Sequence, residues 1–321
     1  MSSIRDHAPS GLQKLPVLVI AGPTASGKTE LAIEVALQCD GEVIGADSRQ
    51  IYRYLDIGTA KPTAAQCKGI TYHMISILPP DAVYSAAEFG KTARQLIRDI
   101  HERGKLPILA GGTGLYIRAA LWGLFDSPAR SPVLRQNLRQ IAAQEGLAAL
   151  HDHLRLVDPI SANRISANDY QRIERALEFF MLTGTSISES QQQHGFRDSP
   201  FIVKFALVSR SRDRLWDAIY KRVILMFNQG FIQEVERLLA RGYPRDLPAM
   251  TSLGYRTVIN LLEGKCTRDA AIDEVAVQTR QYAKRQLTWF KREPIDITLI
   301  NDQPADFSRA VALLCNLVPR T

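Results

Sequence analysis

The first part of the chain alternates between short apolar runs and segments with helical periodicity. Apolar runs occupy 17–20, 42–48 and 106–117, whereas 31–36 and 84–104 repeat their apolar residues every three or four positions. A strand that is followed by a helix and then by another strand is typical of a parallel sheet. We therefore predict an α/β fold with a parallel sheet flanked by helices.

The pattern changes in the middle of the chain and then returns. Between 126 and 200 the apolar residues keep helical spacing without any β-branched run, which predicts an all-helical insertion. The run FIVKFALVS at 201–209 predicts a returning strand, and long helices are expected at 214–241 and 268–292. The predicted organisation is a first core part, a helical insertion and a second core part, at 14–125, 126–200 and 201–321.

Composition narrows the class of protein only slightly. The 321 residues are 45% hydrophobic, as in globular proteins, and 40 Lys and Arg against 33 Asp and Glu give a net charge of +7, which favours a polyanionic partner. The four cysteines form no CxxC pair, so neither a zinc site nor a disulfide framework is indicated. The polar N-terminus and the lack of a long apolar run predict a cytoplasmic protein without a membrane partner.

The first strand leads directly into a phosphate-binding motif. GPTASGKT at 22–29 fits the pattern G-x-x-x-x-G-K-[ST], in which small residues let backbone N–H groups converge on phosphate oxygens at a helix N-terminus. The lysine adds a positive charge, and the Thr29 hydroxyl can bind Mg²⁺. The residues expected to hold phosphates are Gly22, Pro23, Thr24, Ala25, Ser26, Gly27, Lys28 and Thr29.

The loop does not identify the molecule that carries the phosphates. The chain has no N-K-x-D stretch, which argues against a GTPase, and the strand from 106 ends in glycines and Thr113 without an acidic residue, which argues against a motor ATPase. Asp47, at the end of the second strand, could hold the water of a magnesium ion. A small-molecule kinase that uses ATP therefore remains open at this point.

Five longer stretches decide between these classes. ADSRQIYRYLDIGTAKPT, GGTGLYIRAALWGL, QRIERALE, LGYR and TRQYAKRQLTWFKR occur in this order, and together they resemble the tRNA dimethylallyltransferases over 17–292. The resemblance implies a Mg²⁺-dependent transfer of the dimethylallyl group of dimethylallyl diphosphate to the exocyclic amine of an adenosine beside the tRNA anticodon, at position 37. The resemblance also implies a P-loop NTPase-like parallel sheet with an all-helical insertion domain. The P-loop would then hold the diphosphate of an isoprenoid.

The resemblance implies roles for residues of the P-loop and for one arginine beyond it. Lys28, the loop amides and Thr29 with Mg²⁺ would stabilise the leaving diphosphate. Arg222 matches an arginine of the family that reaches the phosphates, although by itself the residue would be assigned to a solvated helix face. A second arginine of the family motif is replaced by Ala218.

The resemblance also implies a base for the reaction. An aromatic amine becomes acidic as its bond to carbon forms, so it needs a proton acceptor within hydrogen-bond reach. Asp47 matches the general base of the family, and Thr113 matches a threonine that faces the reacting groups. The alternatives are a helix cap or a metal-water ligand for Asp47 and a simple tight turn around Thr113.

A tRNA substrate requires a surface that reads the anticodon loop and a channel for the extruded base. In QRIERALE, apolar residues mark one helix face and polar residues another, which is also the pattern of any amphipathic helix. The C-terminal helix carries several cations without an acidic residue among them. The residues expected to contact tRNA are Asp47, Ser48, Arg49, Gln50, Thr113, Gln171, Arg172, Ile173, Glu174, Arg175, Tyr255, Arg256, Arg280 and Lys284.

Several alternatives and departures accompany this interpretation. The nearest alternative is prenyl transfer to free AMP or ADP, and the others are an ATP-dependent kinase and an RNA-binding protein without catalysis. The helical insertion and the basic C-terminal helix favour tRNA, and a monomer is expected. The chain departs from the family pattern at Tyr54, Tyr72, Ser76 and Arg130.

Overall fold

The computed structural model describes residues 14–125, 127–195 and 199–318 and divides into two compact units. The first unit joins the N-terminal 121 residues to the segment from Ser199 onward, and the second runs from Trp122 to Asp198. The second unit corresponds to the predicted insertion, for which the sequence predicted limits of 126 and 200 instead of 122 and 198. The polar N-terminal segment on which the prediction of no leader rested lies largely outside the described residues.

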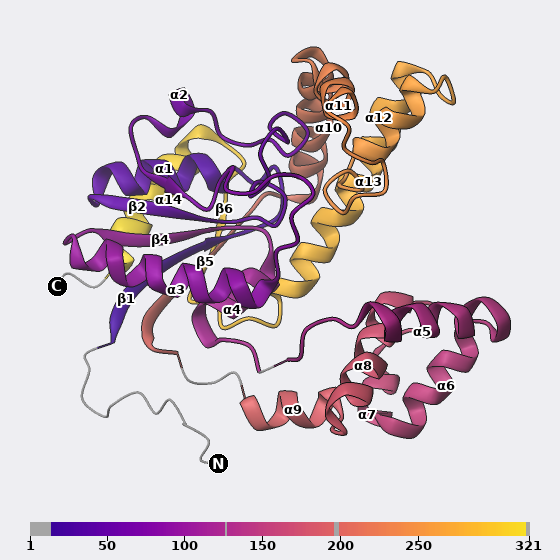
Figure 1. Cartoon of the computed structure of the whole chain (residues 1–321). Coiled ribbons are helices and arrows are strands. Elements are labelled where there is room, and N and C mark those ends of the chain that lie inside the picture. The colour runs from indigo at the N-terminus through magenta and orange to yellow at the C-terminus, as the bar shows by residue number, and fades with distance from the viewer. Residues whose placement is uncertain (1–13, 126, 196–198, 319–321) are drawn as a thin grey trace. The chain divides into compact units, whose positions relative to one another are not determined.

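The first unit is built on one parallel sheet of six strands in the order β3-β2-β4-β1-β5-β6 (Figure 1). Strand β1 lies between β4 and β5, where Leu18 pairs with Ile108 on one side and with Lys204 on the other. The predicted fold class is confirmed. The strands are β1 (Leu15–Ala21), β2 (Gly41–Ala46), β3 (Tyr72–His73), β4 (Leu106–Gly111), β5 (Phe201–Ser209) and β6 (Ile297–Ile300).

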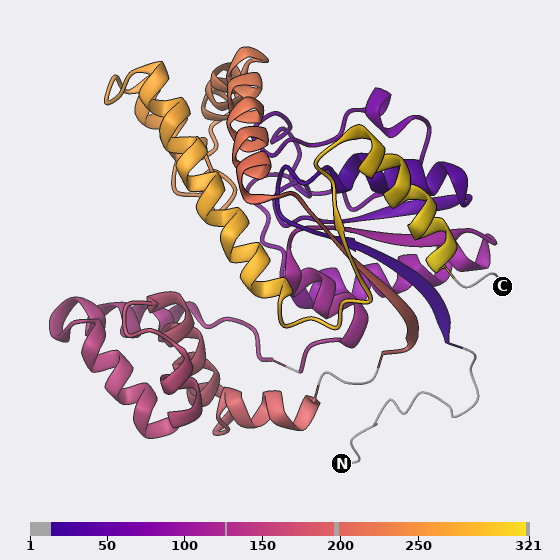
Figure 2. The same cartoon turned by 180° about the vertical axis from the view of Figure 1, so that it is seen from behind.

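Helices cover both faces of this sheet (Figures 1 and 2). On one face, apolar residues of α1 and α14 pack with β1 and β4 in a core where Leu18, Leu31 and Leu314 are fully buried. On the other face α3 and α4 lie together, with the rings of Phe89 and Tyr116 stacked at 4.2 Å. These helices are α1 (Lys28–Gln38), α3 (Ala86–Glu102), α4 (Gly114–Trp122) and α14 (Pro304–Leu317); α2 (Ala64–Cys67) is a short turn of helix.

Four further helices form a second layer of the first unit. Their apolar faces enclose Ile51 and Leu55 from the loop after β2, so this loop belongs to the core that the helices form. The single helix predicted at 214–241 is wrong, because Gly230 adopts φ 101° and separates two helices. The four helices are α10 (Arg212–Asn228), α11 (Phe231–Ala240), α12 (Tyr255–Leu262) and α13 (Arg268–Phe290).

Within the described residues, the second unit contains helices and loops but no strand, as predicted for the insertion. Its small core contains Leu138, Leu154, Ile173 and Leu177, which are nearly or fully buried. A buried carboxylate, Glu178, joins the first helix of this unit to the fourth (see below). The helices are α5 (Pro132–Glu145), α6 (Leu147–Val157), α7 (Pro159–Arg164), α8 (Tyr170–Thr183) and α9 (Ile187–His194).

Candidate active site

The candidate site lies where three neighbouring strands end. Because the strands are parallel, the loops after β1, β2 and β4 leave the sheet at the same edge. The P-loop follows β1, Asp47 follows β2, and Thr113 follows β4. Residues separated by almost 90 positions therefore meet at one end of the sheet, as the sequence predicted for Asp47 and the P-loop.

The P-loop has the geometry of an anion cradle. Ala25 and Gly27 adopt left-handed φ angles of 64° and 87°, which turn the chain tightly into α1. Gly27 caps α1 without a side-chain hydrogen bond, and within the described chain the amides of Gly27, Lys28 and Thr29 donate to no protein acceptor. A Cβ on Gly22 would lie 2.1 Å from the carbonyl oxygen of Val208, so glycine is required there. Unpaired amides at a helix N-terminus suit a phosphate.

Three side chains from distant segments brace this loop. The Gln286 side chain accepts a hydrogen bond from Thr24 N at 2.9 Å and donates to Gly112 O at 2.9 Å. Arg210 Nε donates to Ala25 O at 3.1 Å, and Asn301 Nδ2 donates to Ser26 O at 3.0 Å. The Thr24 amide, which the motif placed among the phosphate donors, is therefore already occupied, and that part of the prediction is wrong for this structure.

No sequence pattern pointed to these braces. Gln286 belongs to a helix that was interpreted as a basic RNA-binding segment, and Asn301 follows β6, a strand that was not predicted. Gln286 follows Lys284 and Arg285 in the sequence, so nothing local marks it as buried, although the structure buries Gln286 and Asn301 almost completely.

A cavity of about 620 Å³ opens beside the P-loop within the first unit. Its walls come from the P-loop, the loop after β2, the end of β4, and the helices α10, α12 and α13. The lining includes Thr24, Lys28, Thr29, Asp47, Ser48, Arg49, Gln50, Gly58, Thr59, Ala60, Tyr72, Gly111, Ile219, Arg222, Val223, Met226, Ser252, Arg256, Gln278, Tyr282, Arg285 and Gln286. The cavity combines a cationic end with apolar walls, which fits a ligand with both characters.

Two cations meet at the cationic end. Lys28 Nζ donates to Pro23 O at 3.1 Å, and burial, assisted by the positive charge of Arg222, lowers the pKa of Lys28 to about 8. Arg222 donates to Thr24 Oγ1 at 3.3 Å and to Ala60 O at 3.5 Å, and burial also lowers the pKa of its guanidinium. Arg222 therefore faces the cavity, and the alternative of a solvated helix face is wrong. Paired cations with lowered pKa values favour a bound anion.

Asp47 lines the same cavity. Its Oδ1 accepts hydrogen bonds from Arg49 N at 2.8 Å and Gln50 N at 3.3 Å, so one oxygen caps the following turn. Its Oδ2 makes no hydrogen bond within the described residues. Thr113 Oγ1 accepts a hydrogen bond from Ser48 N at 3.1 Å, so Thr113 supports the segment that carries Asp47.

Of the residues predicted to contact tRNA near the edge of the sheet and on α12, Thr113 is not among those that line the cavity. Ser48, Arg49, Gln50 and Arg256 line it together with Asp47. Tyr255 does not: its side chain is fully buried and its hydroxyl donates to Glu234 Oε1 at 2.7 Å, so the prediction that it contacts RNA is wrong for this structure.

The two cations predicted on the C-terminal helix lie on α13. Lys284 is exposed, and the guanidinium of Arg280 lies 5.5 Å from the ring centroid of Trp216, which also stacks with Arg212 at 4.2 Å. Arg280 thus belongs to a cluster of two arginines around one tryptophan. Such a cluster suits a phosphate backbone.

The QRIERALE motif lies on α8 of the second unit. Gln171 and Arg172 are exposed, as predicted for an RNA-reading face. Ile173 is fully buried in the helical core, and Glu174 is 4% exposed, with the Tyr170 hydroxyl and Arg135 as partners at 2.8 and 3.1 Å. Neither side chain is available to RNA in this structure, so these two predictions are wrong. Arg175 is tied to Glu178 at 2.6 Å.

The departures from the family pattern have different surroundings. Tyr54 has a left-handed φ of 69°, a conformation that glycine adopts without strain, and Arg241 stacks on its ring at 3.9 Å. Tyr72 lines the cavity, and Ser76 accepts a hydrogen bond from Lys61 at 2.8 Å. Arg130 is exposed.

Fold and site together define a P-loop protein with a cationic, partly apolar cavity at the carboxyl edge of its sheet. A sequence model of the IPP transferase family matches residues 50–293, which is most of the chain. The chain belongs to this family of tRNA dimethylallyltransferases.

Relatives and solved structures agree with this assignment. The tRNA dimethylallyltransferase of Geobacter sulfurreducens is 47% identical over 281 residues, which cover 88% of this chain and 90% of the relative. A tRNA dimethylallyltransferase 2 of Geotalea uraniireducens is 43% identical and covers 96% and 97% of the two chains. The crystal structure of the tRNA isopentenylpyrophosphate transferase of Bacillus halodurans matches with a TM-score of 0.69 at 39% identity, covering 94% and 95%.

A eukaryotic dimethylallyltransferase captured acting on tRNA matches with a TM-score of 0.72 at 28% identity, covering 86% of this chain and 70% of that one. Across the residues described here, no helix has the length and apolar character that crossing a bilayer demands.

Proposed function

We propose that this chain transfers the dimethylallyl group of dimethylallyl diphosphate to N6 of the adenosine beside the anticodon of tRNA, releasing diphosphate. The observation that carries the proposal is that one cavity combines a P-loop, two buried cations and a carboxylate at a strand end. The P-loop and the cations fit a diphosphate, and the carboxylate fits a base for an attacking amine.

The diphosphate would occupy the cationic end of the cavity. Lys28 and Arg222 line that region, and the amides of Gly27 and Lys28 at the start of α1 have no acceptor within the described chain. Negative charge grows on the leaving diphosphate as its bond to carbon breaks, and fixed donors that meet this charge stabilise the transition state. Burial strengthens these interactions because water competes less for the charges.

The donor set also fits a magnesium ion. No cluster of three or more His, Cys, Asp or Glu side chains that could hold a metal occurs among the described residues. Mg²⁺ keeps several waters and commonly binds through substrate phosphates with only one or two protein oxygens, so the Thr29 hydroxyl with a diphosphate is sufficient. When bound, the ion would neutralise charge on the diphosphate.

Asp47 would accept the proton of the adenosine amine. Its Oδ2 is unoccupied by protein donors in the described chain, whereas Oδ1 holds the turn and fixes the direction of the carboxylate. Ser48 and Gln50 border the same region, where the base extruded from the anticodon loop would lie. We further propose that the protein is a monomer and works in the cytoplasm, where the free thiols of the four cysteines would remain reduced.

One experiment separates this function from the alternatives. The protein is incubated with tRNA, Mg²⁺ and dimethylallyl diphosphate, and the nucleosides of the digested tRNA are identified by mass spectrometry. The expected product is dimethylallyl-adenosine, and it is absent without the diphosphate. Parallel incubations replace tRNA with AMP or ADP, or add ATP. A prenylated AMP or ADP, a phosphorylated product formed from ATP, or tRNA binding without any product would each favour one of the alternatives instead.

A further inference from the structure

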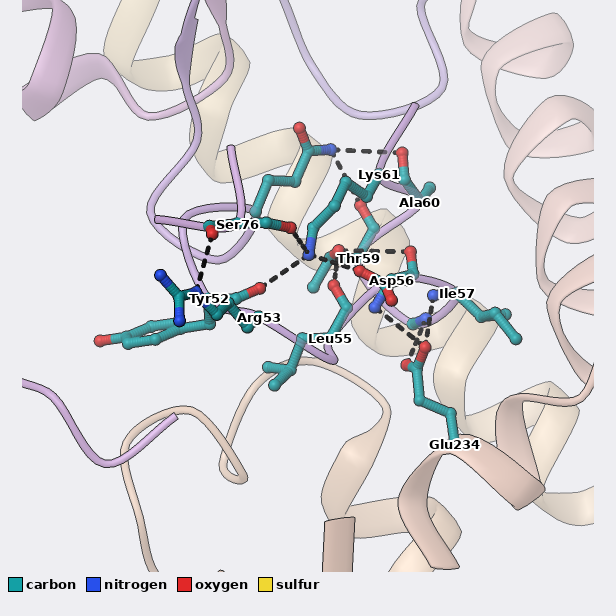
Figure 3. A network of polar contacts seen from close by, with 12 residues as sticks. Tyr52, Arg53, Leu55, Asp56, Ile57, Thr59, Ala60, Lys61, Ser76 and Glu234 are labelled. Atoms are coloured by element: carbon teal, nitrogen blue, oxygen red, sulfur yellow. Dashed lines mark hydrogen bonds and ion pairs between the residues drawn. The ribbon is translucent and has the colours of Figure 1, made fainter. Parts of the chain in front are cut away.

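A loop of the first unit, from Leu55 to Lys61, forms part of the cavity wall and is held by a buried carboxylate of α11 (Figure 3). The carboxylate is Glu234, which is 4% exposed and does not itself line the cavity. It accepts hydrogen bonds from three consecutive backbone N–H groups, those of Asp56 at 2.9 Å, Ile57 at 2.6 Å and Gly58 at 3.0 Å.

The charge of Glu234 has no ion-pair partner among the described residues. Its fourth hydrogen bond comes from the hydroxyl of Tyr255 at 2.7 Å. Three converging amides and a phenol supply enough donors for a carboxylate, and their dipoles take the place of a cation. A buried anion held in this way fixes the backbone that surrounds it, because every donor would lose its partner if the loop moved.

The same loop packs closely against two aromatic rings. A Cβ on Gly58 would lie 2.2 Å from Phe231 Cε2 and 2.6 Å from Tyr255 Cε2, so only glycine permits this approach. At the far end of the loop, Lys61 Nζ is bound by Tyr52 O at 2.7 Å, Asp56 Oδ1 at 2.5 Å and Ser76 Oγ at 2.8 Å. The loop is therefore fixed at both ends.

The fixed loop presents two carbonyl oxygens to residues of the site. Ala60 O accepts hydrogen bonds from Arg222 at 3.5 Å and from Gln50 at 3.2 Å, and Thr59 O accepts one from Gln50 at 3.1 Å. Arg222 belongs to the diphosphate end of the cavity, and Gln50 belongs to the region assigned to tRNA. One short loop thus orients a side chain for each substrate.

We propose that Glu234 is a positioning residue for the reaction, acting through the loop that ends at Ala60 to orient Arg222 toward the diphosphate and Gln50 toward the adenosine. Glu234 touches neither substrate in this arrangement. This inference rests on the proposed function.

The test compares Glu234→Gln with a matched control, Glu236→Gln, which removes an exposed carboxylate two residues away on the same helix. The glutamine keeps the shape of the side chain but replaces one acceptor oxygen with a donor group that faces backbone N–H groups. We expect the KM for dimethylallyl diphosphate to rise about tenfold or more and kcat to fall. We expect the control to behave as the wild type.

Two further readouts separate positioning from a loss of stability. Hydrogen exchange of the amides of 56–58 should accelerate at least about tenfold in Glu234→Gln at a temperature where circular dichroism shows the protein folded. In the background of Arg222→Ala, Glu234→Gln should raise the KM for the diphosphate by much less than it does alone, because the side chain that it orients is missing.

If Glu234→Gln does not fold, Tyr255→Phe is used in its place, because it removes one hydrogen-bond donor to Glu234 and leaves the three amides. The KM for dimethylallyl diphosphate should then rise by a smaller factor. A variant that is less stable but keeps the wild-type KM, kcat and exchange rates would overturn the proposal, as would full additivity with Arg222→Ala. Failure of the proposed function is distinguishable, because the wild type itself would then transfer no dimethylallyl group. The exchange of 56–58 and the binding of inorganic diphosphate would still test the loop.

Discussion

The side-chain oxygen of Gln286, on α13, accepts a hydrogen bond of 2.9 Å from the backbone N–H of Thr24, 262 residues earlier in the chain. The nitrogen of the same side chain donates to Gly112 O at 2.9 Å. One buried amide therefore joins the loops that follow β1 and β4, and the C-terminal helix supports the P-loop directly.

The first prediction concerns this bridge. Gln286→Ala leaves a buried N–H and a buried carbonyl oxygen without partners, which should lower the free energy of unfolding by about 1–3 kcal/mol. The freed P-loop should also bind dimethylallyl diphosphate about tenfold more weakly. Denaturant unfolding and isothermal calorimetry measure the two effects. Thr288→Ala, an exposed change on the same helix, is the control, and equal diphosphate affinity in both variants would contradict the prediction.

The second prediction concerns pH. Burial holds the pKa of Lys28 at about 8 in the protein without ligand, so the ammonium is charged below this value and loses its charge above it. Affinity for dimethylallyl diphosphate should therefore decline as the pH rises through 8, approaching about tenfold per pH unit above it. Titrations from pH 6.5 to 9.5 test this. Lys28→Arg keeps its charge over that range, so its affinity should change little, and an equally steep decline in that variant would assign the titration to another group.

The third prediction distinguishes two roles of Asp47. If the carboxylate takes the proton of the adenosine amine, Asp47→Asn should slow single-turnover transfer by about a hundredfold or more while both substrates bind normally. Magnesium should not restore the rate. If Asp47 chiefly holds the ion or its waters, excess Mg²⁺ should recover most of the rate and the diphosphate should bind more weakly. Single-turnover transfer measured across a magnesium titration decides between the two.

The fourth prediction concerns the RNA surface of α13. Each phosphate that is neutralised by Lys or Arg releases counterions, so tRNA binding should weaken steeply with salt. Replacing Arg280 and Lys284 together with alanine should lower the slope of log K against log salt by roughly 1.4–1.8. The control replaces two exposed cations on other helices, Lys91 and Arg309. An unchanged slope in the first variant would remove α13 from the RNA footprint.

The fifth prediction concerns the second unit. Burial alone raises the pKa of Glu178, but hydrogen bonds from Arg135 and Arg175 outweigh it and bring the pKa to about 2. Because this folded value lies below that of the unfolded chain, the stabilisation is complete above about pH 4.5 and is lost as the pH falls toward 2.

Glu178→Gln breaks this buried network and should destabilise the second unit by about 3–5 kcal/mol at neutral pH. Hydrogen exchange of 131–183 reports this unit separately, and the difference from the wild type should shrink between pH 5 and 3. Glu145→Gln, an exposed change on α5, serves for comparison. A difference that is independent of pH would show that the charge of Glu178 is not what stabilises the helices.

Local sequence was sufficient for those features that depend on neighbouring residues. The P-loop, the strand ends at Asp47 and Thr113 and the helix over 268–290 follow from short-range spacing, since periodicity and glycine-rich turns act within a few residues. The short strand at 297–300 and the helices at 255–262 and 304–317 were not predicted, because segments this short, or this mixed in composition, have weak local signals and are stabilised by packing.

Long-range contacts decided the rest. Sequence marked Tyr255, Ile173 and Glu174 as candidates for RNA contact, yet the first is a buried partner of Glu234 and the other two belong to the core of the helical unit. Gln286 is the opposite case, a residue that the sequence did not mark but that supports the site. Its role depends on two loops that only the folded sheet brings together. Burial and hydrogen-bond partners are properties of the whole packing arrangement, whereas a motif records only which residues follow one another along the chain.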